Sequence, residues 1–189
     1  MSYDRTEIIE AAMRSRHEAI VNATLAAICK YGVAQVGVRE ISKCGKFSAG
    51  LIYKQFPDIP ELVATAIAQL LARDLGAMRL AASREKDAVR GFAAALGALL
   101  AQWDNIRLVH AMIGSPVYRN AMRQELDRLL KPTISGARER ANAAAAVLGA
   151  LYGLQDGDGG TARTRASVAV LFALRGIGLT DGAARRVAA

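Results

Sequence analysis

Residues 37–56, GVREISKCGKFSAGLIYKQF, are the part of this 189-residue chain that decides its fold. The first half of the stretch places Val38, Ile41 and Cys44 at helical spacing, so that their side chains fall on one face of a short helix. Gly45 stands where that helix is expected to end, because glycine adopts the left-handed backbone of a helix terminus without strain. The first half therefore predicts a short amphipathic helix that ends in a tight turn.

The second half predicts another short helix, between Ser48 and Phe56. The hydroxyl of Ser48 can accept a hydrogen bond from one of the backbone N–H groups that a helix start leaves without a partner. Leu51 and Ile52 supply apolar positions inside this helix. Pro57 disfavours the helical backbone in the residue before it, so the helix should end at Phe56.

Basic side chains dominate this stretch. Four bases, Arg39, Lys43, Lys46 and Lys54, against the single acid Glu40 give it a local charge of +3. Such a cluster suits a phosphate backbone, because lysine and arginine displace the counterions that nucleic acid carries. The whole chain has a net charge of +8, but that basicity is spread along it and also fits a protein with no nucleic-acid role. Charge alone therefore leaves both interpretations open.

The same residues resemble the helix-turn-helix of the TetR/AcrR family of transcriptional regulators. The likeness runs through residues 38–42 (VREIS), the turn at Gly45 and Phe47, and residues 48–56 (SAGLIYKQF). Residues 58–62 (DIPEL) then occupy the place where the long fourth helix of the family begins. The likeness covers about the first third of the chain, and the remainder is similar only in length, helical character and apolar content.

The resemblance implies an all-α fold with an N-terminal three-helix DNA-binding domain at residues 1–60, which contains the helix-turn-helix. Residues 61–189 would form a C-terminal helical bundle for ligand binding and dimerisation. A protein of this kind is a homodimer that binds palindromic double-stranded operator DNA, usually as a repressor, and is released by a small apolar or amphipathic effector. It is expected to be cytoplasmic, with no enzymatic activity and no cofactor. The alternative is a helical dimer that binds small molecules or proteins and has lost DNA binding.

The resemblance also assigns roles to residues at matching positions. The predicted DNA-binding residues are Arg39, Lys46, Ser48, Ala49, Gly50, Leu51, Tyr53, Lys54 and Gln55. Those expected to face base edges are Ser48, Ala49, Leu51 and Lys54. Those expected to contact phosphates are Lys46, Tyr53 and Gln55. Gly50 would allow the backbone of the second helix to approach the DNA.

Three positions depart from the family pattern. Lys46 stands where the family usually has glycine, so either Gly45 adopts the left-handed backbone one residue earlier or Lys46 adopts it at a cost of about 1 kcal/mol. Gly37 replaces the threonine that commonly caps the first of the two helices, which predicts a weaker cap. Pro60 replaces a lysine that often contacts phosphate, which predicts one contact fewer.

Composition predicts helices for the rest of the chain. It is 52% apolar but only 5% aromatic, so alanine and leucine supply the hydrophobicity and favour close-packed helices. We expect a polar lead-in at residues 1–13, for which a helix is one alternative, and an amphipathic helix at residues 16–31 that ends at Gly32. The further expected helices are 58–83, 85–103, 116–131, 134–154 and 164–177, with a frayed or short closing helix at 181–189.

The helix expected at residues 164–177 is apolar almost all round, so we expect it to be buried. A second subunit would supply that burial, in an interface built from two helices of each chain. The small residues Ala169, Ala173 and Gly176 would let these helices approach closely.

Several side chains near the turn at residue 114 could line the ligand cavity of the C-terminal domain. They are Trp103, His110, Met112, Tyr118 and Met122. Core packing is the alternative for each of them, because methionine and aromatic residues at helical spacing more often fill a core than line a pocket.

No motif points to catalysis or to a metal site. The two histidines lie far apart, metal-ligand spacing is absent, and Cys29 and Cys44 fit separate buried thiols. The longest apolar runs, 91–100 and 143–154, are much shorter than the ~20 residues that cross a bilayer. We therefore expect no membrane partner, and the N-terminus lacks the pattern of a signal peptide.

Overall fold

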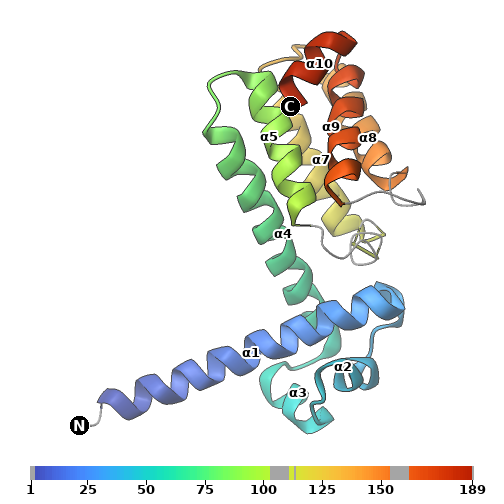
Figure 1. The fold of residues 1–189 in the computed structure, drawn as a ribbon. Coiled ribbons are helices and arrows are strands. Elements are labelled where there is room, and N and C mark those ends of the chain that lie inside the picture. Colours follow the sequence, from blue (N-terminus) through green and yellow to red (C-terminus); the bar gives the residue numbers. More distant parts are fainter. Residues whose placement is uncertain (1–2, 103–110, 113, 154–161, 189) are drawn as a thin grey trace. The chain divides into compact units, whose positions relative to one another are not determined.

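The computed structural model describes residues 3–102, 111–112, 114–153 and 162–188 (Figure 1). Every regular element within these ranges is a helix, so the prediction of an all-α fold is confirmed. The sequence supports this outcome throughout, because its apolar residues are mostly alanine and leucine rather than β-branched.

The chain divides into two compact units. One comprises Met1–Leu70 and Arg107–Gly114, and the other comprises Leu71–Ile106 and Ser115–Ala189. Helix α4 (Ile59–Ser83) contributes its beginning to the first unit and its end to the second. The functional division proposed near residue 60 concerns what the two parts do, and it stays a prediction.

Helix α1 (Tyr3–Tyr31) is a single helix of 29 residues. The prediction that an amphipathic helix begins at Arg16 after a separate lead-in was therefore wrong about the start. The segment before Arg16 contains no glycine or proline to interrupt the helix, and its alanines, glutamates and arginines favour one. The end was predicted correctly: Gly32 has φ +81°, and its N–H donates to the carbonyl of Ile28 at 2.8 Å.

A small core holds the first unit together. The 3₁₀ turn η1 (Val33–Gln35) leads from α1 to α2 (Val38–Gly45), which packs against α1 and α3 (Ala49–Gln55). The buried residues of this core are Ile20, Val21, Ala23, Ala27, Ile41, Ile52, Phe56, Leu62 and Ala66. Ile41 from α2 and Ile52 from α3 are completely buried, which determines the faces of the two short helices that remain outside.

The second unit is a helical bundle. Its helices after α4 are α5 (Ala88–Ala101), α7 (Pro116–Leu130), α8 (Ala137–Gly153), α9 (Ala162–Gly176) and α10 (Asp181–Ala188). The packed pairs are α5 with α9, α7 with α8, α8 with α9, α10 with α9, α5 with α7, and α10 with α5.

Local chemistry explains where these helices begin. Asp87 accepts a hydrogen bond from the Arg90 N–H at 2.9 Å, so α5 begins at Ala88 rather than at residue 85 as expected. Ser115 stands at the N-cap position of α7 and Pro116 at its first position, as predicted, but the Ser115 side chain makes no capping hydrogen bond.

One face of helix α9 is buried by its own subunit, whereas the prediction assigned the burial of this helix to a second subunit. Ala169 and Ala173 are 1% exposed, because this face of α9 packs inside its own bundle. They are therefore not available as close-approach residues for a second chain. The opposite face leaves Val168 and Phe172 exposed, at 49% and 57%.

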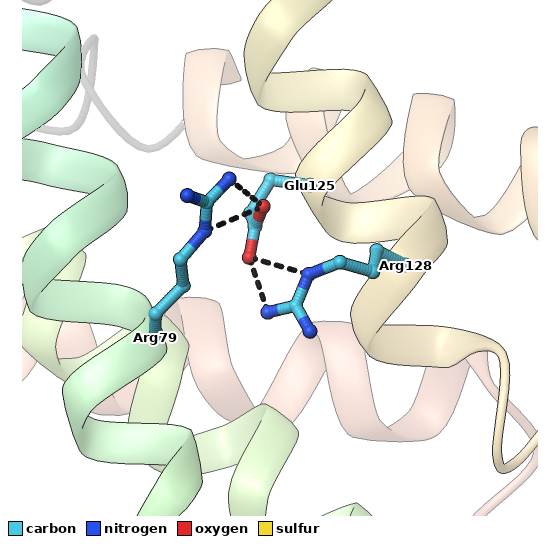
Figure 2. A network of polar contacts seen from close by, with 3 residues as sticks. All are labelled: Arg79, Glu125 and Arg128. Carbon is cyan, nitrogen blue, oxygen red and sulfur yellow. Dashed lines mark hydrogen bonds and ion pairs between the residues drawn. The ribbon is translucent and has the colours of Figure 1, made fainter.

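A buried carboxylate joins α4 to α7 (Figure 2). Glu125 of α7 has a side chain only 3% exposed, and it accepts hydrogen bonds from Arg79 of α4 at 2.7 Å and from Arg128 at 2.5 Å. Burial by itself would raise the pKa of Glu125, but the hydrogen bonds and positive charges of the two arginines outweigh it and lower that pKa. Glu125 is therefore held as a carboxylate between two cations.

Candidate nucleic-acid interface

The turn between α2 and α3 depends on Gly45 having no side chain. A Cβ atom at this position would lie 2.4 Å from the ring of Phe47 and 2.7 Å from Cβ of Ala23 in α1. Both distances are far below van der Waals contact, so any other residue would push α2 away from α1 or displace Phe47. Gly45 therefore fixes how closely α2 approaches α1.

Lys46, rather than Gly45, adopts the left-handed backbone. Its φ is +56° and its ψ +34°, and it is the non-glycine residue with positive φ in the described part of the chain. This geometry decides between the two alternatives that the sequence left open. The strain is about 1 kcal/mol, and the lysine side chain is exposed on the turn.

The start and end of α3 follow the sequence prediction. The Leu51 N–H donates to Oγ of Ser48 at 3.2 Å, so Ser48 caps the helix. Phe56, before Pro57, has the extended backbone φ −134° and ψ +131°, which ends the helix. Its N–H still donates to the Ile52 carbonyl at 2.9 Å, so the last turn is closed.

The first helix of the pair compensates for its weak cap. The Gly37 N–H donates to Oε2 of Glu40 at 3.2 Å, which is one half of a capping box. Glycine has no side chain to return the second bond. At α4, Oδ1 of Asp58 accepts from the Glu61 N–H at 2.7 Å, and Pro60 stands in the first turn, where its missing N–H costs little. Both departures are thus accommodated by the fold.

All nine predicted DNA-binding residues lie outside the core of the first unit. The exposed ones are Arg39, Lys46, Ser48, Ala49, Gly50, Tyr53 and Lys54, and the half-buried ones are Leu51 and Gln55. Leu51 also packs against the core, which limits how far it can reach outward. A Cβ on Gly50 would meet nothing within 4 Å, so internal packing gives no reason for glycine there. The roles assigned to these residues stay predictions.

His17 stacks on Phe56, a contact that the sequence did not reveal. Their ring centroids lie 4.5 Å apart with an interplanar angle of 30°. The two residues are far apart in sequence, so no local spacing could have indicated the pair. Through it, α1 supports the residue that ends α3.

The predicted ligand-binding residues have different outcomes. Trp103 and His110 lie outside the described residues. Met112 is completely buried, as is Met122 of α7, and Tyr118 is 1% exposed. Such burial fits core packing as well as it fits the wall of a cavity, so the role of these three residues in ligand binding stays a prediction.

Asp74 of α4 is a buried polar residue that sequence reasoning missed. Its carboxylate is 0% exposed, Oδ2 accepts from the Tyr118 hydroxyl at 2.6 Å, and Oδ1 accepts from Arg73 at 2.9 Å. Buried carboxylates require such partners, because an isolated charge is costly inside a protein. Asp74 and Tyr118 are 44 residues apart, so no local sequence pattern indicated that they form a pair.

A groove of about 490 Å³ opens elsewhere on the second unit. It is lined by Ile134, Glu139, Asn142, Ala143, Ala146, Gly176, Ile177 and Gly178. The three predicted ligand-binding residues that the structure describes, Met112, Tyr118 and Met122, are not among those that line it.

Metal and membrane sites are not found in the described ranges. No cluster of three or more histidine, cysteine or acidic residues there could hold a metal ion. None of the helices described is both long enough and apolar enough to span a bilayer.

The helical arrangement has counterparts among solved structures. RolR bound to resorcinol superposes with a TM-score of 0.59 at 18% identity, covering 95% of this chain and 96% of that one. A TetR-like transcriptional regulator from Rhodococcus sp. RHA1 gives 0.68 at 17%, covering 87% and 97%. SmeT, the repressor of the Stenotrophomonas maltophilia multidrug efflux pump SmeDEF, gives 0.60 at 17%, covering 84% and 88%.

These structures define the fold of the chain as that of the TetR-like transcriptional regulators. No family model matches the sequence, and no curated protein matches it. The likeness at these identities is one of fold.

Proposed function

We propose that this protein is a ligand-responsive transcriptional regulator that binds palindromic operator DNA as a homodimer and acts as a repressor. The observation that carries the proposal is the pair α2 and α3, which buries Ile41 and Ile52 and leaves Lys46, Tyr53 and Lys54 exposed. A short helix with small residues at its start and cationic residues beside it suits the major groove.

Specificity would arise partly from shape. The exposed start of α3 offers Ser48, Ala49 and Gly50, which have little hydrogen-bonding capacity toward bases. Apolar contact with thymine methyl groups and the deformability of the operator would supply part of the discrimination. The cations would then contribute a sequence-independent, salt-dependent share of the affinity.

A small apolar or amphipathic effector would release the DNA. RolR, one of the solved structures with this fold, was crystallised with resorcinol, a molecule of that kind. In this chain, Met122 and the Asp74–Tyr118 pair combine apolar and polar groups in the second unit. An effector would act through different affinities for the two states of the dimer. The proposal includes no catalytic step.

A mobility-shift assay on the DNA upstream of the protein's own gene, repeated over a salt series, tests the proposal. Saturable binding with a steep salt dependence is expected. Lys46→Ala removes a predicted phosphate contact and should reduce the slope of log affinity against log salt by about 1. Lys131→Ala makes the same charge change at an exposed site of the second unit and should leave the slope unchanged.

Binding no tighter than to random duplex would overturn the DNA-binding proposal. It would leave the alternative of a helical dimer that binds only small molecules or proteins. Effector classes can be compared by the rise in melting temperature that each one causes, because a ligand that binds the folded state stabilises it.

A further inference from the structure

A buried carboxylate and a buried phenol face each other between α4 and α7. Asp74 of α4 is 0% exposed and Tyr118 of α7 is 1% exposed. The Tyr118 hydroxyl donates to Oδ2 of Asp74 at 2.6 Å. Replacing a buried charged group and its partners by well-packed apolar residues is often neutral or stabilising. Stability alone therefore does not account for a carboxylate at this place.

The charge of Asp74 is already balanced, but its hydrogen-bonding capacity is not used up. Nε and Nη2 of Arg73 donate to Oδ1 at 3.0 and 2.9 Å, from a side chain that is 47% exposed. Among the described residues, Oδ2 accepts only from Tyr118, although a carboxylate oxygen can accept two hydrogen bonds. A second cation at Oδ2 would leave an unbalanced charge inside the unit, which is costly. The remaining acceptor position therefore suits a neutral donor.

The second carboxylate between the same helices has no such position. Arg79 of α4 and Arg128 donate to Glu125 of α7 (Figure 2). Each Glu125 oxygen accepts two hydrogen bonds, Oε2 from Arg79 and Oε1 from Arg128. Of these two buried carboxylates, Asp74 is therefore the one that can accept a hydrogen bond from a ligand.

Methionines adjoin the Asp74–Tyr118 pair on both helices. Met78 follows Asp74 by four residues on α4, and Met122 follows Tyr118 by four on α7, so each lies one turn further along the same face. Both are 0% exposed. The unbranched methionine side chain has three rotatable bonds and adapts its shape to what packs against it. A flat apolar group can therefore enter here by displacing flexible side chains.

We propose that the effector is a neutral aromatic compound with a hydroxyl group, which donates to Oδ2 of Asp74 while its ring packs against Met78 and Met122. A matching ring without the hydroxyl would have the same apolar contacts and no hydrogen bond to the carboxylate. The inference rests on the ligand-responsive part of the proposed function, and it names the chemical class of the effector and the atom that selects it.

Isothermal titration of the full chain with phenol and with anisole tests the inference, because anisole carries a methyl group in place of the hydrogen that phenol donates. The native chain should bind phenol roughly ten-fold or more tightly than anisole, as expected for a hydrogen bond to a charged group. Asp74→Asn should reduce this preference to about three-fold or less, because the acceptor becomes neutral. Glu125→Gln makes the same change of carboxylate to amide at the saturated pair and should leave the preference unchanged.

Tyr118→Phe distinguishes the acceptor from its present donor. Without the Tyr118 hydroxyl, Oδ2 has no partner in the ligand-free chain and gains one only from the ligand. Phenol should therefore bind at least about three-fold more tightly than to the native chain, and anisole should bind as before. Weaker binding of phenol to this variant would show that the ligand contacts the Tyr118 hydroxyl rather than Asp74, which overturns the inference.

Three further results would also overturn it: equal affinities of the native chain for phenol and anisole, no binding of either at millimolar concentration, or a full preference for phenol in Asp74→Asn. Circular dichroism shows whether Asp74→Asn folds, and if it does not, the native chain and Tyr118→Phe decide. In every case DNA binding and release by another class of effector remain, so the proposed function stands or falls by the mobility-shift assay.

Discussion

The imidazole ring of His17 stacks on the phenyl ring of Phe56, with their centroids 4.5 Å apart. This contact ties the middle of α1 to the residue that ends α3. Phe56 is 3% exposed and belongs to the core of the first unit, so the stacked imidazole covers part of that core. The helix that carries Tyr53 and Lys54 is therefore anchored at its end by a residue of α1.

His17→Ala should destabilise the chain by about 1 kcal/mol, which is typical of an aromatic pair together with its lost burial. The measurement is urea unfolding followed by circular dichroism. Glu18→Ala is the matched control, because the neighbouring side chain is exposed on the same helix, and it should change stability much less. Equal effects of the two substitutions would show that the stacking contributes nothing measurable.

Substitutions at the neighbouring residues Gly45 and Lys46 should change the stability of the fold in opposite directions. Gly45→Ala introduces the Cβ that would lie 2.4 Å from Phe47, so a loss of roughly 1–3 kcal/mol is expected from overpacking. Lys46→Gly relieves the left-handed strain and should stabilise by about 1 kcal/mol. Thermal unfolding of the two variants measures both effects.

Lys46→Gly also separates stability from DNA affinity. It removes a cation next to the proposed groove-binding helix, so DNA binding should weaken although the fold becomes more stable. A variant that is both more stable and tighter on DNA would remove Lys46 from the predicted phosphate contacts.

Sequence analysis predicted those features that depend on neighbouring residues. Ser48, Pro57 and Gly32 determine helix ends through their own backbone chemistry, and the structure agrees at each of them. Sequence analysis left open whether Gly45 or Lys46 adopts the left-handed backbone. The choice depends on how closely Ala23 and Phe47 approach Gly45. That approach is a property of the packed unit and is not visible in the local sequence.

Tertiary pairs were beyond the reach of that reasoning. Asp74 with Tyr118 and Arg79 with Glu125 are separated by 44 and 46 residues, so no periodicity relates them. The faces of α9 could not be assigned either, because a helix apolar on nearly every side gives no indication of which side its own subunit covers.

The pairing of the Glu125 carboxylate with Arg79 and Arg128 predicts that the stability of the fold depends on pH. The pKa of Glu125 is lowered in the folded chain, so its contribution is present above the ordinary carboxyl value of about 4.3 and is lost as pH falls through the folded-state pKa. Glu125→Gln should cost roughly 1.5–3 kcal/mol at neutral pH, the range for hydrogen bonds to charged groups. The difference between variant and native chain should shrink as the pH falls below about 4.

Urea unfolding at several pH values measures this difference. Glu85→Gln provides a control, since Glu85 is an exposed acid of the same unit, and it should change stability much less at every pH. A Glu125→Gln deficit that stays constant between neutral and acid pH would show that the buried amide, rather than the lost charge, causes the destabilisation.

Tyr53 tests the orientation of α3 on DNA without altering the fold. Its side chain is 51% exposed, whereas Ile52 beside it is completely buried, so the phenol points away from the core. If its hydroxyl donates to a phosphate, Tyr53→Phe should weaken binding about five-fold on operator and random duplex alike, because phosphate contacts carry no sequence information. Tyr31→Phe removes a hydroxyl from the same unit at the end of α1 and should leave affinity unchanged. A loss confined to the operator would instead place Tyr53 against base edges, and an unchanged affinity would remove it from the interface.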